Sequence, residues 1–467
     1  MCLLGWGGDS GGNNGPDAIL TLAPGEDWQA RVDAAPAGAV FTVKAGVHRL
    51  QTVTPKSDQQ FLAEPGAVMS GAKLLDDWVQ SGATWYVDGQ TQEFGYDVGV
   101  CAPGKACQYP EDVYRDDVLL HRELSLAAVG PGDFYFDYAA DRIYVGDDPV
   151  GHRLEAAATE YAFLGSPEGA GTGVVVRGLI IEKYANAAQF GAIGRSNTPA
   201  GWVIEGCEIR YNRGAGIRTG NIQVIRSHIH HNGQIGIVGG GGSETLISDN
   251  EIDHNNTVGF APDWEGGGVK FGGGYFTGIR VQNNQIHHND GIGLWADGDI
   301  DQFVWDGNTV VDNTWDGVKV EISYGGEVTG NVIEENGFAN PNDFEGAGIL
   351  IYSSGGSGLT ISGNVLSGNH NGIVLIGAER GNGPLGPLIT KNVSVHDNDL
   401  TLEGNQATGA HYYGVSSGLW TTDHNHFAHN AYQLQSAGAT PFLWEGARRS
   451  DAEWRVYGND EHGTFNR

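Results

Sequence analysis

The sequence predicts an all-β protein that folds as a right-handed parallel β-helix. A short motif, in which Asn lies three positions after an inward-facing apolar residue, recurs about every 23 residues, with insertions, between residues 209 and 430. Short Val/Ile/Leu runs broken by Gly separate the copies, which fits strands of period two and not long helices. The 75 glycines among 467 residues suit tight coil corners, where a positive φ is needed.

The asparagine of each motif is expected to form a ladder. Stacked Asn side chains can bond to the same residue type above and below, which satisfies buried amides in the turns. The histidines that recur at these turns are assigned a structural role, and no His/Cys/Asp spacing matches a zinc site. The motif asparagines are Asn212, Asn232, Asn255, Asn289, Asn313, Asn336, Asn369, Asn398 and Asn430. The recurring histidines are His230, His231, His254, His287 and His288.

The chain divides into five predicted segments. The repeat vanishes in one segment, where aromatic and hairpin-like strings take its place, so we expect an inserted β-rich subdomain there. Helices over residues 27–34 and 451–457 would cover the two ends of the solenoid, whose exposed strand edges otherwise invite aggregation. The segments are an N-terminal tether (1–16), a cap with the first coils (17–75), the inserted subdomain (76–161), the main coils (162–435) and a C-terminal cap (436–467).

Charge and cysteine content bear on partners and location. The 57 acidic and 26 basic residues give a net charge of −31, which disfavours nucleic acid as a partner. No apolar run reaches the ~18 residues of a transmembrane span. Cys101 and Cys107 can form a small disulfide in an oxidising compartment, and Cys207 is expected to be a buried thiol. Cys2 resembles the mature end of a bacterial lipoprotein, so we expect a secreted or cell-envelope protein with a lipid anchor, unless Cys2 lies at an arbitrary chain end.

The strands that follow the asparagine turns predict two outward columns of side chains on one face. Asp297 and Glu321 occupy the same place in consecutive copies, so they would lie on neighbouring strands about 4.7–4.9 Å apart. The inward residues are Ile217, Ile237, Val269, Leu294, Val318, Ile349 and Ile373. The first outward column is Arg218, Val238, Lys270, Trp295, Lys319, Leu350 and Val374, and the second is Gly220, Gly240, Gly272, Asp297, Glu321, Tyr352 and Ile376.

This face has the composition of a carbohydrate cleft. The predicted spacing of the two acids is close to the ~5–5.5 Å of a retaining glycosidase. We expect lysines to keep Asp297 ionised and the anionic neighbour to raise the pKa of Glu321. Two long loops, 256–267 and 337–346, would form walls on either side. The residues expected to contact an oligo- or polysaccharide are Trp295 as an aromatic platform, Lys270, Lys319, Tyr352, Arg218, Trp264 and Glu265.

The strings around the two acids resemble a known family. Gly293-Leu-Trp-Ala-Asp297, the turn at Asn313 and Val320-Glu-Ile-Ser323 are similar to the paired motif of β-helical glycoside hydrolases, particularly the β-helical β-xylosidase family, and to related bacterial β-helix repeat proteins. The resemblance implies that Asp297 is the nucleophile and Glu321 the general acid/base of a retaining mechanism. No cofactor is implied.

Two other functions are compatible with the same residues. In a polysaccharide lyase or uronate epimerase, Lys270 or Lys319 would be the base, and Asp297, Asp299 and Glu321 would hold Ca²⁺. Tyr352 or Arg218 would assist that reaction. The third function is a non-catalytic carbohydrate-binding solenoid.

Overall fold

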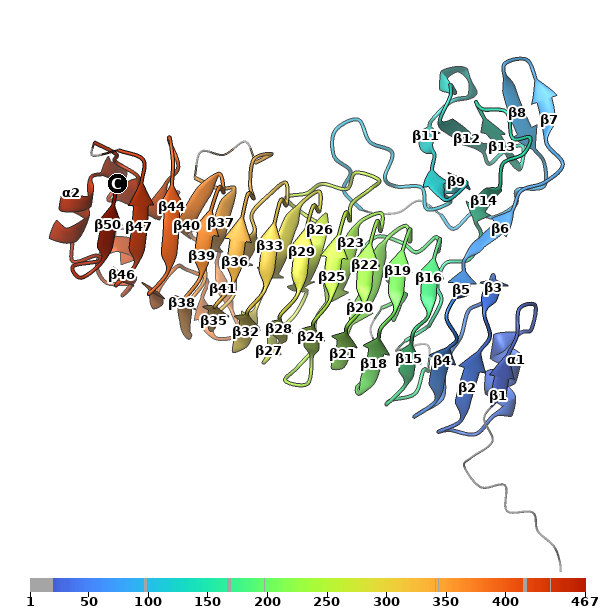
Figure 1. Cartoon of the computed structure of the whole chain (residues 1–467), viewed down its shortest axis with the longest axis horizontal. Helices are drawn as coiled ribbons and strands as arrows, with labels where there is room; N and C mark the ends of the chain where they lie inside the picture. Colours follow the sequence, from blue (N-terminus) through green and yellow to red (C-terminus); the bar gives the residue numbers. More distant parts are fainter. Residues whose placement is uncertain are drawn as a thin grey trace, which may run out of the picture.

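Three long sheets of parallel strands run the length of the molecule and form a β-helix (Figure 1). Each strand pairs with the equivalent strand of the next coil, so the backbone hydrogen bonds run along the solenoid axis. The computed structural model describes residues 20–95, 99–165, 169–196, 198–340, 342, 344–414, 418–436 and 438–467. Cys2 and the predicted tether 1–16 lie outside these ranges.

The first sheet, sheet A, has thirteen strands. They are β1 (Leu20–Leu22), β2 (Val40–Val43), β4 (Gln60–Ala63), β15 (Val175–Arg177), β18 (Trp202–Glu205), β21 (Ile222–Ile225), β24 (Leu246–Ser248), β28 (Arg280–Gln282), β32 (Phe303–Asp306), β35 (Gly325–Thr329), β38 (Gly358–Ser362), β43 (Val393–His396) and β46 (His426–Ala428).

The second sheet, sheet B, follows sheet A in each coil and also has thirteen strands. They are β3 (Gly46–Arg49), β5 (Ala67–Ser70), β16 (Ile180–Glu182), β19 (Glu208–Arg210), β22 (His228–His230), β25 (Glu251–Asp253), β29 (Gln285–His287), β33 (Thr309–Val311), β36 (Val332–Glu334), β39 (Val365–Ser367), β44 (Asp399–Leu402), β47 (Ala431–Leu434) and β50 (Thr464–Asn466).

The third sheet, sheet C, has eleven strands and carries the two acids singled out by the sequence. They are β17 (Gly191–Ile193), β20 (Ala215–Thr219), β23 (Ile235–Gly239), β26 (Gly267–Gly272), β30 (Ile292–Asp297), β34 (Val318–Glu321), β37 (Ala347–Tyr352), β40 (Asn371–Gly377), β45 (Thr408–Tyr412), β48 (Phe442–Trp444) and β49 (Ala447–Arg449).

Four short strands lie beside the three sheets, in the turns that follow sheet C. They form two pairs, one parallel and one antiparallel. The pairs are β27 (Phe276–Thr277) with β31 (Ile300–Asp301), and β41 (Asn382–Gly383) with β42 (Gly386–Pro387). A 3₁₀ turn, Gly418–Trp420, follows β45.

The hydrophobic core fills the inside of the coils. On sheet C each of seven successive coils directs an aliphatic side chain inward at the same position, and the register aligns these side chains into a continuous row, as the sequence predicts. Each of these side chains is buried, and the removal of its apolar surface from water contributes roughly 1.5–3 kcal/mol to the stability of the fold. The row is Ile217, Ile237, Val269, Leu294, Val318, Ile349 and Ile373.

The asparagines form two ladders where the sequence analysis expected one. The first, at the turn from sheet B to sheet C, contains Asn212, Asn232, Asn255, Asn289, Asn313, Asn336 and Asn369. The second, at the turn from sheet A to sheet B, contains Asn250, Asn284, Asn308, Asn331, Asn364, Asn398 and Asn430. The placement of Asn398 and Asn430 in the first series was therefore wrong.

The two misplaced asparagines follow a different strand from the others. Asn398 and Asn430 come after sheet A strands, and their Val395 and Phe427 have the same spacing to Asn as the sheet B residues of the earlier motifs. The second ladder ends at Asp460, whose Oδ1 accepts from the backbone N–H and the side-chain amide of Asn430. A carboxylate fits at this last rung because only an acceptor is required there.

Helices cover both ends of the solenoid, as predicted (Figure 1). Helix α1 (Trp28–Ala34) starts at Asp27, which accepts a hydrogen bond from the backbone of Ala30, and it buries Trp28 on the first coils. Helix α2 (Asp451–Val456) starts with a capping box between Ser450 and Glu453 at the other end.

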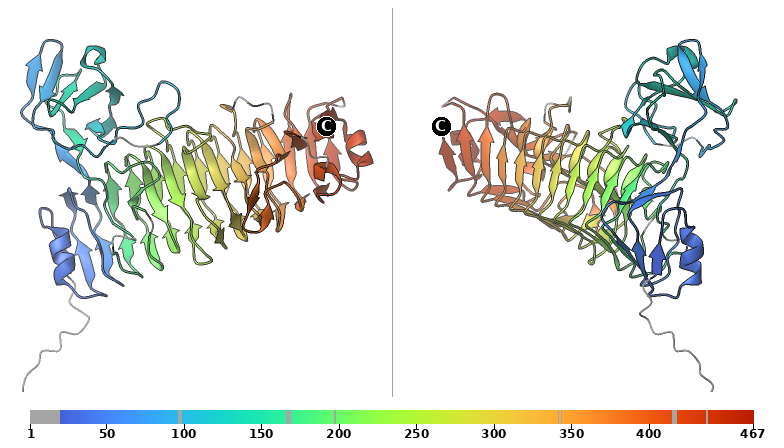
Figure 2. Two further views of the ribbon diagram at one scale, coloured as in Figure 1. Left: turned by 180° about the vertical axis from the view of Figure 1, so that it is seen from behind. Right: turned by 45° about the vertical axis from the view of Figure 1, so that its right-hand side comes forward.

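A separate β-rich unit projects from the N-terminal end of the solenoid (Figure 2). Its two sheets have their own buried apolar cluster. One sheet contains β6 (Ala72–Leu74), β9 (Val113–Arg115), β10 (Val118–Leu119) and β14 (Leu154–Ala157). The other contains β7 (Val79–Ser81), β8 (Thr84–Val87), β11 (His121–Glu123), β12 (Asp133–Asp137) and β13 (Arg142–Val145), with a 3₁₀ turn at Leu126–Ala128.

Ion pairs and a disulfide connect this unit to the coils. Glu155 lies 2.5 Å from Lys183 Nζ and 2.6 Å from Arg49, and both bases belong to the solenoid. Cys101 and Cys107 form the predicted disulfide in a loop that packs on the coils, where Cys101 pairs with Phe260.

Cys207 is a buried free thiol, as expected. Neither α-helix in the described part of the chain has the length and apolar character of a membrane span.

Candidate functional site

Asp297 and Glu321 lie side by side on sheet C. Asp297 is the last residue of β30 and Glu321 the last residue of β34, and the two are register partners in parallel pairing. The neighbours on either side are Gly272 and Tyr352, in the order that the sequence predicts. The side chain of Asp297 is 26% exposed and that of Glu321 is 11% exposed, so a ligand at this surface would contact both carboxylates.

Each of the two carboxylates has cationic partners. Lys270 Nζ lies 2.7 Å from Asp297 Oδ2, and Lys319 Nζ lies 3.0 Å from Glu321 Oε2. Arg380 Nη1 donates to Glu321 Oε1 at 2.9 Å. The lysines come from the first outward column, whose side chains reach across to the second column. The site is therefore a compact array of alternating charges.

The expectation that the pKa of Glu321 is raised is wrong for the protein without ligand. Burial raises this pKa, but the charges of Lys319 and Arg380 and the hydrogen bonds they donate outweigh burial and hold it below its ordinary value. Burial lowers the pKa of Lys270 despite its pairing with Asp297. For Lys319 burial acts the same way, but nearby acids more than compensate and raise its pKa.

Trp295 does not form the predicted platform for a sugar. Its side chain is only 2% exposed. The ring lies between two lysines, with Lys270 Nζ 3.6 Å and Lys319 Nζ 5.2 Å from its centroid. The position is outward, as predicted, but loops cover this column: Lys270 also donates to the carbonyl of Trp264, which belongs to the first insertion. Trp295 therefore supports the lysines by cation–π contact and has no free face for stacking.

The two residues expected from the first insertion have different environments. Trp264 is 60% exposed, and its ring centroid lies 5.9 Å from Lys270 Nζ, so it is available at the edge of the site. Glu265 is 2% exposed, and its carboxylate accepts from the backbone of Val100 and from Gln189 Nε2. The expected sugar contact of Glu265 is therefore wrong, because this carboxylate holds the disulfide loop against the coils.

The second insertion packs over sheet C on the far side of the pair. Its Phe344 lies against a small apolar cluster that includes Leu350 and Val374 of the first column. Tyr352, the register partner of Glu321, is partly buried at the border of this cluster. Burial raises the pKa of Tyr352, and Arg380 lies 5.5 Å from the centroid of its ring.

A groove lies along sheet C and includes Gly272, the register partner of Asp297. It has a volume of about 370 Å³ and is lined by the three glycines of the second column, with Arg218 at its wall. A Cβ at Gly240 would come within 2.2 Å of the Phe276 ring, so the groove floor depends on glycine. Arg218 donates to the backbone carbonyls of Ser196 and Gln189 and does not touch either acid. It lies two coils before Lys270. The glycines are Gly220, Gly240 and Gly272.

Sequence reasoning missed Arg380, which belongs to the turn after β40. This turn is held by Tyr324, whose hydroxyl accepts from the backbone N–H of Leu385 and donates to the carbonyl of Gly386. One feature of the sequence could have drawn attention to this residue: Arg380 is the only arginine between Arg280 and Arg448.

Asp316 is a further acid that the sequence analysis did not single out. It is fully buried next to sheet C, and burial raises its pKa to about 6, against the opposing charge of Lys319. It accepts a hydrogen bond from the backbone of Ala347 at 2.7 Å. Asp316 therefore adds to the negative surroundings that raise the pKa of Lys319.

The chain is similar to known β-helical proteins. The sequence model described as "Right handed beta helix region" matches residues 171–264, 192–356 and 263–393. The protein is thus a right-handed parallel β-helix, as predicted. No curated protein matches it in sequence.

Solved structures that are similar to the chain include the following two. A structure of XylC in complex with xylose has a TM-score of 0.62 and 15% identity, covering 94% of this chain and 82% of that chain. The A-module of mannuronan C-5 epimerase AlgE6 from Azotobacter vinelandii has a TM-score of 0.54 and 14% identity, covering 94% of both chains. At these identities the likeness establishes the fold.

Proposed function

We propose that the protein is a carbohydrate-active enzyme, and specifically a glycoside hydrolase with Asp297 and Glu321 as its catalytic carboxylates. The observation that carries the proposal is the register pairing of the two acids at the ends of β30 and β34. Neighbouring strands are about 4.7–4.9 Å apart, and retaining glycosidases place their two carboxyl groups about 5–5.5 Å apart. The structurally similar XylC is described in complex with xylose.

The proposed mechanism gives the two acids different roles. Asp297, next to Gly272 of the groove, attacks the anomeric carbon and forms a covalent glycosyl-enzyme, while Glu321 protonates the leaving oxygen. Water then attacks the same carbon, and Glu321 accepts its proton. Lys270 Nζ forms an ion pair with Asp297 Oδ2 at 2.7 Å. Trp264, at the rim, offers an exposed ring to a bound sugar. The product keeps the anomeric configuration of the substrate.

Glu321 must gain a proton before it can act as an acid. Arg380 is 38% exposed and reaches Glu321 from a surface turn, whereas Lys319 is 8% exposed and fixed beneath it. We infer that a sugar bound beside Glu321 displaces Arg380. Loss of this ion pair removes one of the charges that lower the pKa of Glu321, while burial continues to raise it. The proton is then available where the leaving oxygen lies.

Replacing Arg380 by Met is expected to shift one limb of the pH–rate profile. Removal of the Arg380 charge is expected to raise the pKa of Glu321, because one of the groups that lower it is lost. A general acid is active below its pKa, so the basic limb of kcat/KM moves to higher pH in Arg380→Met. The measurement is the pH dependence of kcat/KM for wild type and variant.

The same experiment discriminates between the two roles of Glu321. If Glu321 were the nucleophile, it would have to be ionised, and the acidic limb would move to higher pH in place of the basic one. That result would contradict the assignment. Arg280→Met serves as the control, because Arg280 is exposed on sheet A and its removal is expected to leave both limbs unchanged.

A polysaccharide lyase or uronate epimerase is the second candidate. The specific observation in its favour is that burial lowers the pKa of Lys270, which makes this lysine a better base for the proton α to a uronate carboxylate. The expected Ca²⁺ site fits less well. Asp297 and Glu321 already have cationic partners, and in the described ranges neither acid belongs to a group of three ligands within reach of one ion.

Product analysis separates these functions. Wild-type protein is incubated with a panel of aryl glycosides, neutral polysaccharides and uronate polymers. A glycosidase releases reducing sugar without forming a double bond. An unsaturated uronate, detected by its ultraviolet absorbance, would support the lyase and contradict the hydrolase. An epimerised polymer of unchanged length would support the epimerase, and binding without any change of the polymer would support a carbohydrate-binding solenoid.

We also propose that the protein works outside the cytoplasm. The Cys101–Cys107 disulfide supports an oxidising compartment. A polysaccharide substrate is consistent with this location. Lipid attachment at Cys2 stays a prediction.

A further inference from the structure

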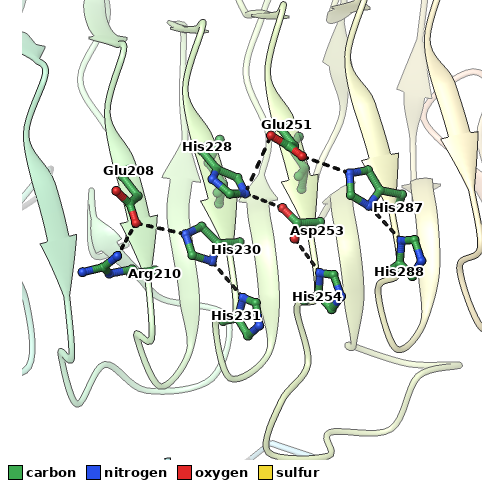
Figure 3. A network of polar contacts seen from close by, with 12 residues as sticks. Glu208, Arg210, His228, His230, His231, Glu251, Asp253, His254, His287 and His288 are labelled. Atoms are coloured by element: carbon green, nitrogen blue, oxygen red, sulfur yellow. Dashed lines mark hydrogen bonds and ion pairs between the residues drawn. The ribbon is translucent and has the colours of Figure 1, made fainter. Parts of the chain in front are cut away.

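A network of histidines and carboxylates lies along neighbouring strands of sheet B and the turns that follow them (Figure 3). Asp297 and Glu321 belong to a different sheet, sheet C. His228 of β22 is the register partner of Glu251 of β25. Asp253 lies two residues after Glu251 on the same strand, so both acids point outward on the same side. His287 of β29 is in turn the register partner of Asp253. The network thus connects three neighbouring coils.

Three of these side chains point to a common position. His228 Nε2 lies 2.6 Å from Asp253 Oδ1 and 4.0 Å from Glu251 Oε2. The three ligand atoms all lie within 4.8 Å of one another. A tetrahedral ion with bonds of about 2.0–2.1 Å would separate its ligand atoms by about 3.3 Å. The two observed separations bracket this value, so small side-chain rotations suffice to accommodate an ion.

The second oxygen of each carboxylate is held by another histidine. Asp253 Oδ2 lies 2.5 Å from His254 Nδ1, and Glu251 Oε1 lies 3.3 Å from His287 Nε2. Figure 3 shows these two histidines on the far side of the carboxylates from His228. Hydrogen bonds of this kind orient metal-binding carboxylates in proteins. Each acid therefore presents one oxygen to His228 and has the other one fixed.

The network is built on regular β-strands. His228, Glu251 and Asp253 all lie within strands, and Asp253 is only 5% exposed. His228 is 39% exposed at its side chain and Glu251 48%, so an ion can reach the position from solvent. Pre-positioned ligands on strands lose little conformational entropy on binding.

We propose that His228, Glu251 and Asp253 form a binding site for one Zn²⁺ ion, with His254 and His287 as positioning residues. Zn²⁺ takes imidazole nitrogen and carboxylate oxygen together, whereas Ca²⁺ requires six to eight oxygen ligands. The ion bridges the coils of β22 and β25 and so connects neighbouring turns of the solenoid. This site is independent of the proposed glycosidase pair.

The prediction that the turn histidines are structural did not include His228, and no zinc-ligand spacing was recognised in the sequence. The reason is that the ligands come from different coils: His228 and Asp253 are 25 residues apart. Short-range ligand spacings do not occur in a site of this kind.

Isothermal titration of metal-free protein with Zn²⁺ tests the proposal. Wild type is expected to bind one ion, with a higher thermal unfolding midpoint when Zn²⁺ is present. His228→Ala and Glu251→Gln are each expected to weaken binding at least about 100-fold, and His287→Ala about 10–100-fold. X-ray absorption of the zinc complex is expected to give only nitrogen and oxygen ligands at about 2.0–2.2 Å.

The control is His396→Ala. His396 is 34% exposed and lies 2.7 Å from Asp397, so it matches His228 in exposure and pairing but belongs to sheet A. This variant is expected to bind Zn²⁺ like wild type.

Three results would overturn the assignment. The first is wild type that binds no Zn²⁺, or binds Ca²⁺ in its place. The second is unchanged binding in both His228→Ala and Glu251→Gln. The third is loss of binding in His121→Ala, because His121, Glu123 and Asp133 form another group of suitable ligands in the projecting β-rich unit.

Discussion

Asp297→Asn is expected to lower kcat for glycoside hydrolysis about 10⁴-fold or more, the size of effect that follows loss of a covalent catalyst. The amide that replaces the carboxylate cannot form the glycosyl-enzyme, and Lys270 loses the partner 2.7 Å away. The loss is expected for every substrate, whatever its leaving group, because the attack on the anomeric carbon is needed in all cases. Initial rates on an aryl glycoside that wild type hydrolyses provide the measurement.

Glu321→Gln is expected to have an effect that depends on the leaving group. A general acid contributes about 10²–10⁴-fold when the leaving group needs a proton. An aryl glycoside with a very acidic phenol needs none, so its glycosylation step is expected to survive in this variant. Glu327→Gln, an exposed acid of sheet A, is the control and is expected to retain wild-type rates. The glycosylation rate is measured for this substrate and for a glycoside whose leaving group needs a proton. Equal losses of rate on the two substrates would contradict the acid role of Glu321.

Asn313→Ala is expected to destabilise the coils by about 3–5 kcal/mol. The Asn313 side chain accepts from the backbone and the amide of Asn289, and it donates to Asn336 and to the carbonyl of Ile286. All of these groups are buried, and each buried group left without a partner costs about 1–3 kcal/mol. Urea unfolding monitored by circular dichroism measures the loss.

A control and an intermediate variant sharpen this test. Asn405 is exposed, and Asn405→Ala is expected to change stability by no more than about 0.5 kcal/mol. Asn313→Asp keeps the acceptor oxygen but loses the donated bonds, so its stability should lie between those of wild type and Asn313→Ala. If Asn313→Ala unfolded at the same urea concentration as Asn405→Ala, the ladder would not contribute as proposed.

The sequence predicts the coil register well because one strong pattern repeats. An inward aliphatic residue fixes the face of every other residue in a strand, so the pairing of Asp297 with Glu321 follows from counting. The same counting failed at Asn398 and Asn430. Sheet A and sheet B strands both end in a turn with Asn, and the motif alone cannot distinguish them.

Burial of the outward residues was harder to predict than their direction. Trp295 points outward as expected, yet it is covered, because the turns before sheet C fold back over the first column. The carboxylate of Glu265 likewise accepts a hydrogen bond from the backbone N–H of Val100, a residue that is distant in sequence. Period-two patterning reports which side of a strand a residue occupies, but it contains no information about loops that return to that side.

The pKa of Glu321 depends on a residue that no repeat pattern includes. Arg380 comes from the turn after β40, and its ion pair with Glu321 acts together with that of Lys319 to outweigh burial and lower this pKa. The proposed zinc ligands His228, Glu251 and Asp253, in contrast, belong to the regular strands. They can be recognised as a possible metal site only when the sequences of adjacent coils are aligned, because the ligands come from different coils.

Trapping of the glycosyl-enzyme tests the central claim most directly. Wild type is incubated with a 2-deoxy-2-fluoro glycoside of the sugar that it releases, carrying a good leaving group, and the labelled peptide is sequenced by mass spectrometry. The account predicts one sugar per chain, attached to Asp297. A label on Glu321, or rapid turnover of hydrolysable substrate without any covalent adduct, would contradict it.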